Sequence, residues 1–188
     1  MDDDPFNFGD AEQGPTVWTV GHSTREVDDF IRLLKANQIA NLVDVRSYPG
    51  SHRHPQFNQG HLNKSLADSG IGYYHLGKLG GRRKPVPDSK NTAWRNASFR
   101  AYADYMESAE FRMGIRELID LARRAPTAIM CAEAVWWRCH RSLIADYLKA
   151  HGLEVIHIID AARAETHPYT AAARIINGQL SYAGLFPE

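Results

Sequence analysis

The hydrophobic and polar positions near the start of the chain predict a strand, a helix and a second strand. Residues 16–20 form a short apolar, β-rich run that ends at a glycine, as expected of a buried strand. Apolar residues then recur with helical spacing to about Asn37, behind a capping box formed by Ser23 and Glu26. Residues 42–45 form the second strand. A strand–helix–strand unit of this kind places its two strands in parallel.

The middle of the chain is less regular. Residues 51–70 are polar and show no clean period, so we expect a loop, whereas residues 73–76 fit a third short strand. A long loop rich in glycine, proline and basic residues follows over residues 77–96. Two helical segments come next, of which the first can be capped by Ser98 and the second stops at Pro126.

The last third of the chain continues the alternation. Residues 127–131 predict a strand, residues 132–138 a loop, and residues 139–151 a helix that ends at a glycine. Residues 154–159 form the last clear strand, and residues 160–188 indicate turns and a short helix.

Alternating strands and helices predict an α/β fold, namely a single domain over residues 16–188. We expect an open, mostly parallel sheet with helices on both faces, in a Rossmann-like three-layer arrangement. The acidic residues 1–15 predict a disordered tail. In such sheets, ligands bind outside the carboxyl ends of the strands. The loops expected to meet there cover residues 21–25, 44–47, 77–84 and 131–141.

Composition places the chain among ordinary globular proteins, with 44% hydrophobic and 23% charged residues. No apolar run approaches the roughly 18 residues that cross a bilayer, so we expect no membrane partner. Two cysteines are too few for a disulfide framework, which favours a cytoplasmic protein with reduced thiols.

The formal net charge is zero, but the charge is distributed unevenly. Residues 46–100 hold ten Lys or Arg against two acidic residues, a net charge of +8 for this segment. Clustered positive charge predicts an anionic partner, such as a nucleotide or a nucleic acid. The alternative is that these cations pair with acidic residues elsewhere in the fold.

The most informative segment runs from Cys131 to Arg141. Cys131 and Glu133 leave a predicted strand, and Cys139 and His140 open a predicted helix. The amides and dipole of a helix start favour an anion, which Cys139 and Arg141 would help to bind. Glu133 and His140 are candidate general acids or bases. It remains open whether Cys131 is only a small core residue and the Glu133 carboxylate only braces Arg141.

The same segment is a poor match to a metal site. Its Cys-x7-Cys-His spacing fits no standard zinc motif. On a helix, Cys139 and His140 would point about 100° apart, so they would not easily share one ion. We therefore expect no metal and no required cofactor, with Cys131 and Cys139 as the candidate ligands if a metal does bind. The six residues between Cys131 and Arg138 also exceed the phosphatase-type spacing, so neither cysteine is expected to be an essential nucleophile.

Two other strand ends carry candidate site residues. His22 can titrate near neutral pH and is a candidate acid or base, while Ser23 can seat an anion or simply cap a helix. Asp44 and Arg46 share one face of a strand, so they can pair with each other. Alternatively, Asp44 acts as an acid or base beside Arg46 and Ser47, which would bind the anion.

Two loops complete the candidate set. The loop over residues 77–84 resembles a phosphate-contacting loop without the Walker spacing, through Gly80, Gly81, Arg82 and Arg83. The adjacent Trp136 and Trp137 can serve as platforms for nucleic-acid bases, or they can form a lid that packs on the core.

Four motifs together resemble a bacterial and archaeal family named as domain of unknown function 488. They are Val20-Gly21-His22-Ser23, Asp44-Val45-Arg46-Ser47-Tyr48-Pro49, Leu79-Gly80-Gly81 and Cys131-Ala132-Glu133…Cys139-His140-Arg141. The resemblance spans about residues 16–160 and implies a compact α/β fold and cytoplasmic residence. It implies no reaction.

The leading hypothesis is an enzyme, a hydrolase or group transferase, that acts on a phosphate-bearing ligand such as a nucleotide or nucleic acid. Two alternatives remain. The first is a non-catalytic nucleic-acid-binding module built on the basic segment, and the second is a metal or thiol redox protein that uses Cys131 and Cys139.

Overall fold

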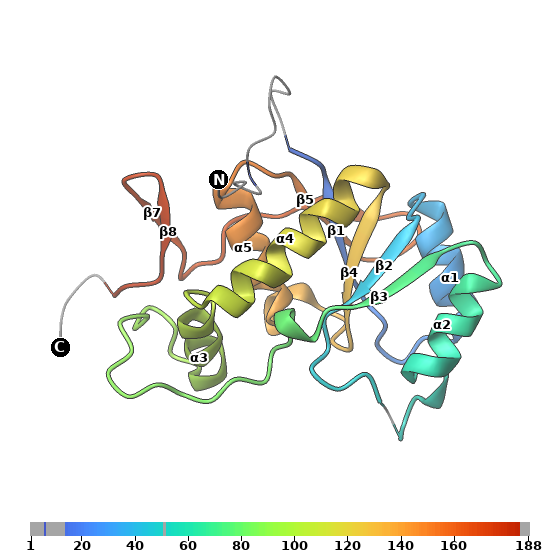
Figure 1. The fold of residues 1–188 in the computed structure, drawn as a ribbon, viewed down its shortest axis with the longest axis horizontal. Helices are drawn as coiled ribbons and strands as arrows, with labels where there is room; N and C mark the ends of the chain where they lie inside the picture. Colours follow the sequence, from blue (N-terminus) through green and yellow to red (C-terminus); the bar gives the residue numbers. More distant parts are fainter. Residues whose placement is uncertain (1–5, 7–13, 51, 185–188) are drawn as a thin grey trace.

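Six strands form one sheet in the order β3-β2-β4-β1-β5-β6 (Figure 1). The computed structural model describes Phe6, residues 14–50 and residues 52–184. The strands of the sheet are β1 (Val17–Gly21), β2 (Asn41–Asp44), β3 (Gly72–His75), β4 (Thr127–Cys131), β5 (Val155–Ile158) and β6 (Ala164–Thr166). The first five are parallel, and β6 runs antiparallel to β5 at one edge.

Helices cover both faces of the sheet (Figure 1). The helices are α1 (Val27–Ala36), α2 (Gln59–Ala67), α3 (Ala97–Tyr105), α4 (Ala109–Arg124) and α5 (Arg141–Ala150). One core cluster joins α1 and α2 to Val20 and Met130, and the other joins α3, α4 and α5 to Ile129 and Cys131. Successive residues of a strand point to opposite faces, so β4 contributes to both clusters. The predicted single-domain α/β fold with three layers is confirmed.

The order of the strands decides which loops meet. β4 lies between β1 and β2, in register with both, so Cys131 pairs with Gly21 and Met130 with Asp44. All three strands are parallel, and their carboxyl ends therefore share one edge of the sheet. The loops that leave β1, β2 and β4 start side by side there.

The predicted capping box at Ser23 is wrong. Helix α1 begins at Val27, with Glu26 as its N-cap and no side-chain cap. Ser23 has a positive φ of 52°, because the chain turns there to hydrogen-bond with the loop after β4. The amide of His22 donates to the Cys131 carbonyl, and the amide of Ser23 donates to the Ala132 carbonyl. Hydrogen bonds to Cys131 and Ala132, far away in the sequence, therefore take the place of the predicted helix cap at Ser23.

Other boundaries also differ from the predictions. The expected loop over residues 51–70 contains α2, whose period is weak because only Leu62 and Leu66 are buried. The helix after the Trp pair is capped at His140 and starts at Arg141 instead of Cys139. The first helix of the central pair is capped by Asn96, not Ser98.

The carboxyl-terminal part also departs from the expected turns and short helix. Its described portion, residues 160–184, contains no helix. Instead it holds β6 and a hairpin of β7 (Arg174–Ile176) and β8 (Gln179–Ser181). Apart from Phe6 and residues 14 and 15, the predicted acidic tail lies outside the described residues.

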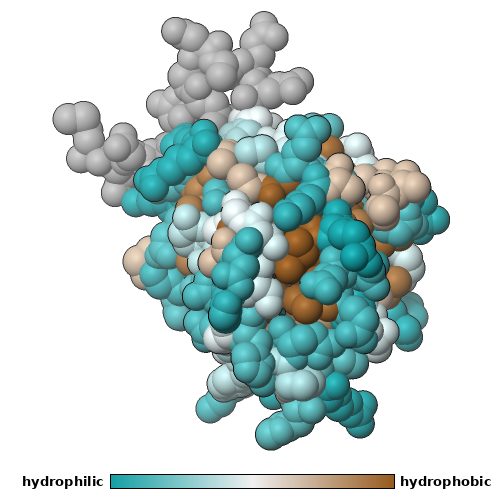
Figure 2. Space-filling model, turned by 90° about the vertical axis from the view of Figure 1, so that its right-hand side faces the viewer, coloured by the Kyte–Doolittle hydropathy of each residue, from teal (hydrophilic) through white to brown (hydrophobic). Residues whose placement is uncertain are grey.

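No helix among the described residues is long and apolar enough to cross a membrane. On the side of the molecule that carries α1 and α2, the surface is mostly hydrophilic, with hydrophobic side chains showing only in small areas (Figure 2).

Candidate functional site

A cavity of about 650 Å³ opens at the carboxyl ends of β1, β2 and β4. It lies where the strand order predicts a ligand site in an open α/β sheet, and its volume is typical of a small-molecule site. Its lining includes His22, Ser23, Arg46, Ser47, Tyr48, His54, Gly81, Arg82, Cys131, Glu133, Arg138, Cys139 and His140.

Asp44 and Arg46 pair with each other at the end of β2. The Arg46 guanidinium donates from Nε and Nη2 to the Asp44 carboxylate, over 2.6 to 3.1 Å. The Tyr73 hydroxyl donates to the same carboxylate over 2.7 Å. Asp44 is fully buried and does not line the cavity, so it orients Arg46 and does not face a ligand. Arg46 does line the cavity, with its Nη1 lying 3.5 Å from His22 Nε2.

His22 is held as a neutral imidazole. Its ring stacks on Phe57 at 4.2 Å, and its Nδ1 donates to the Ser23 carbonyl over 2.9 Å. Burial is the main cause that lowers the pKa of His22 to about 4. The hydrogen bond to the Ser23 carbonyl acts to raise this pKa, and the nearby Arg46 charge lowers it further. The expectation that His22 titrates near neutral pH therefore gives way to a ring that stays uncharged at neutral pH.

Ser23 and Ser47 line the cavity, as candidate anion-binding residues must. The Ser23 amide already donates to the Ala132 carbonyl, so that amide is not available to an anion. The Ser47 hydroxyl accepts from the Arg82 amide over 3.2 Å and thereby ties the loop after β2 to the glycine-rich loop.

The glycine-rich loop lies against this edge of the sheet because its two glycines have no side chain. A Cβ at Gly80 would stand 2.5 Å from Ser47 Oγ, and one at Gly81 would stand 2.5 Å from His140 Nδ1. Arg82 lines the cavity. Arg83 does not: it donates to three carbonyls of residues 77–80 and lies over the Tyr105 ring, so its role is structural.

Glu133 and Arg141 do not form the ion pair that was the alternative to a ligand-facing Glu133. Arg141 is 1% exposed, and its guanidinium donates to the backbone carbonyl of Glu133 over 2.6 Å and to Thr19 Oγ1 over 3.2 Å. Arg141 is therefore a buried brace for the loop and is not positioned to bind a ligand. The Glu133 residue is exposed and lines the cavity, which leaves its carboxylate available for chemistry.

The tryptophans do not line the cavity. Trp136 is buried, stacks on His157 at 4.3 Å and donates from Nε1 to the Glu165 carboxylate over 2.6 Å. Trp137 packs edge-on against it and is 51% exposed. Trp136 therefore packs on the core, which was the alternative to its role as a platform for nucleic-acid bases.

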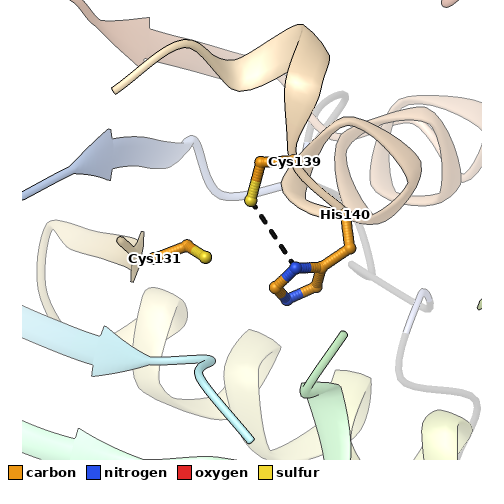
Figure 3. Close-up of side chains that lie close together, drawn as sticks. All are labelled: Cys131, Cys139 and His140. Atoms are coloured by element: carbon orange, nitrogen blue, oxygen red, sulfur yellow. Dashed lines mark hydrogen bonds between the residues drawn. The ribbon is translucent and has the colours of Figure 1, made fainter. Parts of the chain in front are cut away.

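Cys131, Cys139 and His140 all line the cavity and lie close together (Figure 3). Their ligand atoms all lie within 4.8 Å of one another, and Cys139 Sγ is 3.5 Å from His140 Nδ1. Cys139 and His140 do not diverge by the 100° predicted for helical neighbours, because Cys139 has extended backbone angles and lies before α5. The three side chains point toward a common space.

The two thiols differ in their electrostatics. The hydrogen bond to Cys139, together with burial, raises the pKa of Cys131 well above its usual range. Burial also acts to raise the pKa of Cys139, but the Cys131 hydrogen bond and the neighbouring His140 outweigh it and lower that pKa well below its usual range. Cys139 is therefore the sulfur that more readily becomes a thiolate.

Two residues that were not predicted as site residues, Arg138 and His54, also line the cavity. Arg138 directly precedes the Cys139-His140 pair, and this position in the sequence could have identified it as a site residue. His54 lies in a polar stretch without a period, and no local pattern distinguishes it from the neighbouring His52 and His61.

The profile of the family described as "Domain of unknown function DUF488" matches residues 26–148. That range covers more than half of the chain, including the ends of β2 and β4 and the Cys139-His140 pair. The chain belongs to the DUF488 family. The DUF488 match leaves out β1 and β5, so His22 and Ser23 lie outside it. No curated protein and no solved structure matched the chain.

Proposed function

We propose that this DUF488 protein is an enzyme that catalyses hydrolysis or group transfer on a small phosphate-bearing ligand, such as a nucleotide. The observation that carries the proposal is the charge of the cavity. Among the described residues, three guanidinium groups, from Arg46, Arg82 and Arg138, line it against one carboxylate, that of Glu133, while the charge of Arg46 is balanced by the buried Asp44. Arginine binds phosphate through paired, charge-assisted hydrogen bonds.

The three cations differ in how firmly the fold holds them, which suits a ligand site. Arg46 is held by the buried Asp44 carboxylate and by the Phe57 carbonyl, so its position is fixed before a ligand arrives. Arg82 and Arg138 are exposed; Arg82 lies in the glycine-rich loop, and Arg138 ends a short 3-10 helix, Trp136–Arg138. A preorganised cation lowers the entropic cost of binding, and exposed side chains can adjust to the shape of the ligand.

Glu133 is the candidate acid or base of the proposed reaction. It is the one carboxylate that lines the described cavity, and its exposed side chain is free of the Arg141 brace. In hydrolysis it would accept a proton from the attacking water, or it would donate one to the departing oxygen.

The basic segment gives less support to a nucleic-acid-binding module. Several of its cations that do not line the cavity are engaged within the fold: Lys64 with Asp68, Lys78 with Glu117, and Arg83 with backbone carbonyls. A small ligand in the cavity needs only the cations that line it.

The test is calorimetric binding of ADP and pyrophosphate at low salt, followed by assays of phosphate release from a nucleotide panel. We expect Arg82→Ala and Arg138→Ala each to weaken binding about tenfold, since each removes a charge-assisted contact worth about 1.5 kcal/mol. Arg116→Ala, an exposed arginine of α4 outside the cavity, is the matched control and should bind normally. Equal binding by all four proteins would refute the proposed site.

A further inference from the structure

We propose that Cys131, Cys139 and His140 bind a Zn²⁺ ion whose fourth coordination position opens into the cavity. Zinc binding by these three side chains does not depend on which ligand the cavity takes.

The spacing of the ligand atoms fits a tetrahedral centre. With zinc–sulfur and zinc–nitrogen bonds of about 2.3 and 2.0 Å, tetrahedral geometry separates sulfur from nitrogen by about 3.5 Å. Cys139 Sγ and His140 Nδ1 are 3.5 Å apart. All three ligand atoms lie within 4.8 Å of one another, so little movement would bring them around one ion. Figure 3 shows both sulfurs and the imidazole directed into the same space.

The hydrogen bonding of His140 prepares its ring for a metal. Its Nε2 lies 3.1 Å from the carbonyl oxygen of Val45, which can only accept a hydrogen bond. Nε2 therefore carries the proton, and the lone pair is on Nδ1, the nitrogen that faces Cys139. Metal-bound histidines usually donate their other N–H to a carbonyl or carboxylate in this way.

The packing around His140 keeps the ring in that orientation. Gly81 lies so close that a Cβ would stand 2.5 Å from Nδ1, and the Tyr102 ring packs edge-on at 5.1 Å. Cys131 and Cys139 are also buried, at 8% and 3% exposure. Rigid, buried ligands lose little conformational freedom when an ion binds.

The identity of the ion follows from the donor set. Thiolate and imidazole ligands select zinc and other borderline or soft metals over Mg²⁺ and Ca²⁺, which prefer oxygen. Three protein ligands with an open fourth position are typical of catalytic zinc sites, whereas structural sites use four. All three residues line the cavity, so the fourth position is accessible to water or to an anionic ligand.

The experiment measures zinc directly on the full chain, purified without a histidine tag and stripped with a chelator. Zn²⁺ is added against a chromophoric competitor, and the reloaded protein is analysed by metal mass spectrometry. We expect one zinc per chain. Replacement by Co²⁺ should give the intense thiolate charge-transfer absorption and the visible bands of tetrahedral cobalt.

Variants assign the ligands. Cys139→Ser and His140→Ala should each weaken zinc binding at least a hundredfold, while His61→Ala, an exposed histidine of α2, should bind as wild type does. Gly81→Ala should weaken binding about tenfold, because the new methyl group displaces the His140 ring without removing a ligand.

A readout on the wild type protects the test against variants that misfold. Bound zinc should protect both thiols from alkylation, and the chelator should restore their reactivity. A wild-type protein that binds no stoichiometric zinc, or whose thiols an added thiol oxidant converts to a disulfide equally fast with and without zinc, would overturn the proposal. Zinc binding without ADP binding would support the metal centre and refute the nucleotide site, so the two failures are distinguishable.

Discussion

Asp44 and Arg46 lie two residues apart at the end of β2. The Arg46 guanidinium donates hydrogen bonds of 2.6 to 3.1 Å to the Asp44 carboxylate. The carboxylate is fully buried, and Arg46 is 7% exposed. Removing either partner leaves a buried charge without its counterion, which costs far more than the pair contributes.

Asp44→Asn should therefore lower the free energy of unfolding by about 3 kcal/mol, measured by denaturant titration. Asp29→Asn is the matched control, because Asp29 pairs with Arg32 on the exposed surface of α1. It should change stability by less than about 0.5 kcal/mol. Similar small effects from both variants would show that Arg46 finds other partners in the cavity.

The neutral His22 should make the protein sensitive to acid. The unfolded chain binds a proton at His22 near pH 6.5, while the folded chain holds the pKa at about 4, mainly through burial and also through Arg46. Protonation therefore favours the unfolded chain, so stability is highest above pH 6.5 and falls as the pH decreases toward 4.

Between pH 6.5 and 5.5 this one histidine should cost about 1 kcal/mol of unfolding free energy. The check compares denaturant titrations of wild type and His22→Asn over this range, and the variant should lose that part of the slope. His61→Asn, an exposed histidine, should keep the wild-type slope. An unchanged slope in His22→Asn would contradict the assignment.

Gly21 should not tolerate a side chain, because a Cβ there would lie 1.8 Å from the carbonyl oxygen of Glu133. Gly21→Ala must push the two loops apart and should destabilise the protein by about 2 kcal/mol or more. Gly60→Ala offers the opposite control, since that glycine lies in α2 with open space around it, and alanine there should stabilise by about 0.5 kcal/mol. Thermal melts of the two variants should shift in opposite directions.

Glu133→Gln separates catalysis from folding. Arg141 holds the Glu133 carbonyl and not its carboxylate, so the variant should melt within about 0.5 kcal/mol of wild type. If Glu133 is the acid or base of the proposed reaction, turnover should fall at least about a hundredfold while ADP binding is retained. Glu107→Gln, an exposed carboxylate outside the cavity, serves as the control. Normal turnover in Glu133→Gln would remove the catalytic role.

Local pattern was sufficient for the elements with many buried positions. The apolar run of residues 127–131 predicts a buried strand, and these residues form β4 with the same bounds. The helical period that stops at Pro126 predicts α4, which ends just before that proline. The alternation of these elements determined the parallel sheet, because consecutive parallel strands need a crossover. The period of α2 was missed because its contact with the core rests on two leucines.

The sequence by itself determined the fold class and the edge of the sheet where the polar loops gather. Only the tertiary structure decided what those loops do there. Strand order is set by hydrogen bonds between segments about a hundred residues apart, as between Gly21 and Cys131, and no local period encodes it. The cluster of Cys131, Cys139 and His140 forms because the loop after β4 folds back and Cys139 has an extended backbone. This fold of the loop also directs Arg141 to a carbonyl, because a buried guanidinium bonds to the acceptors that the packed chain offers it.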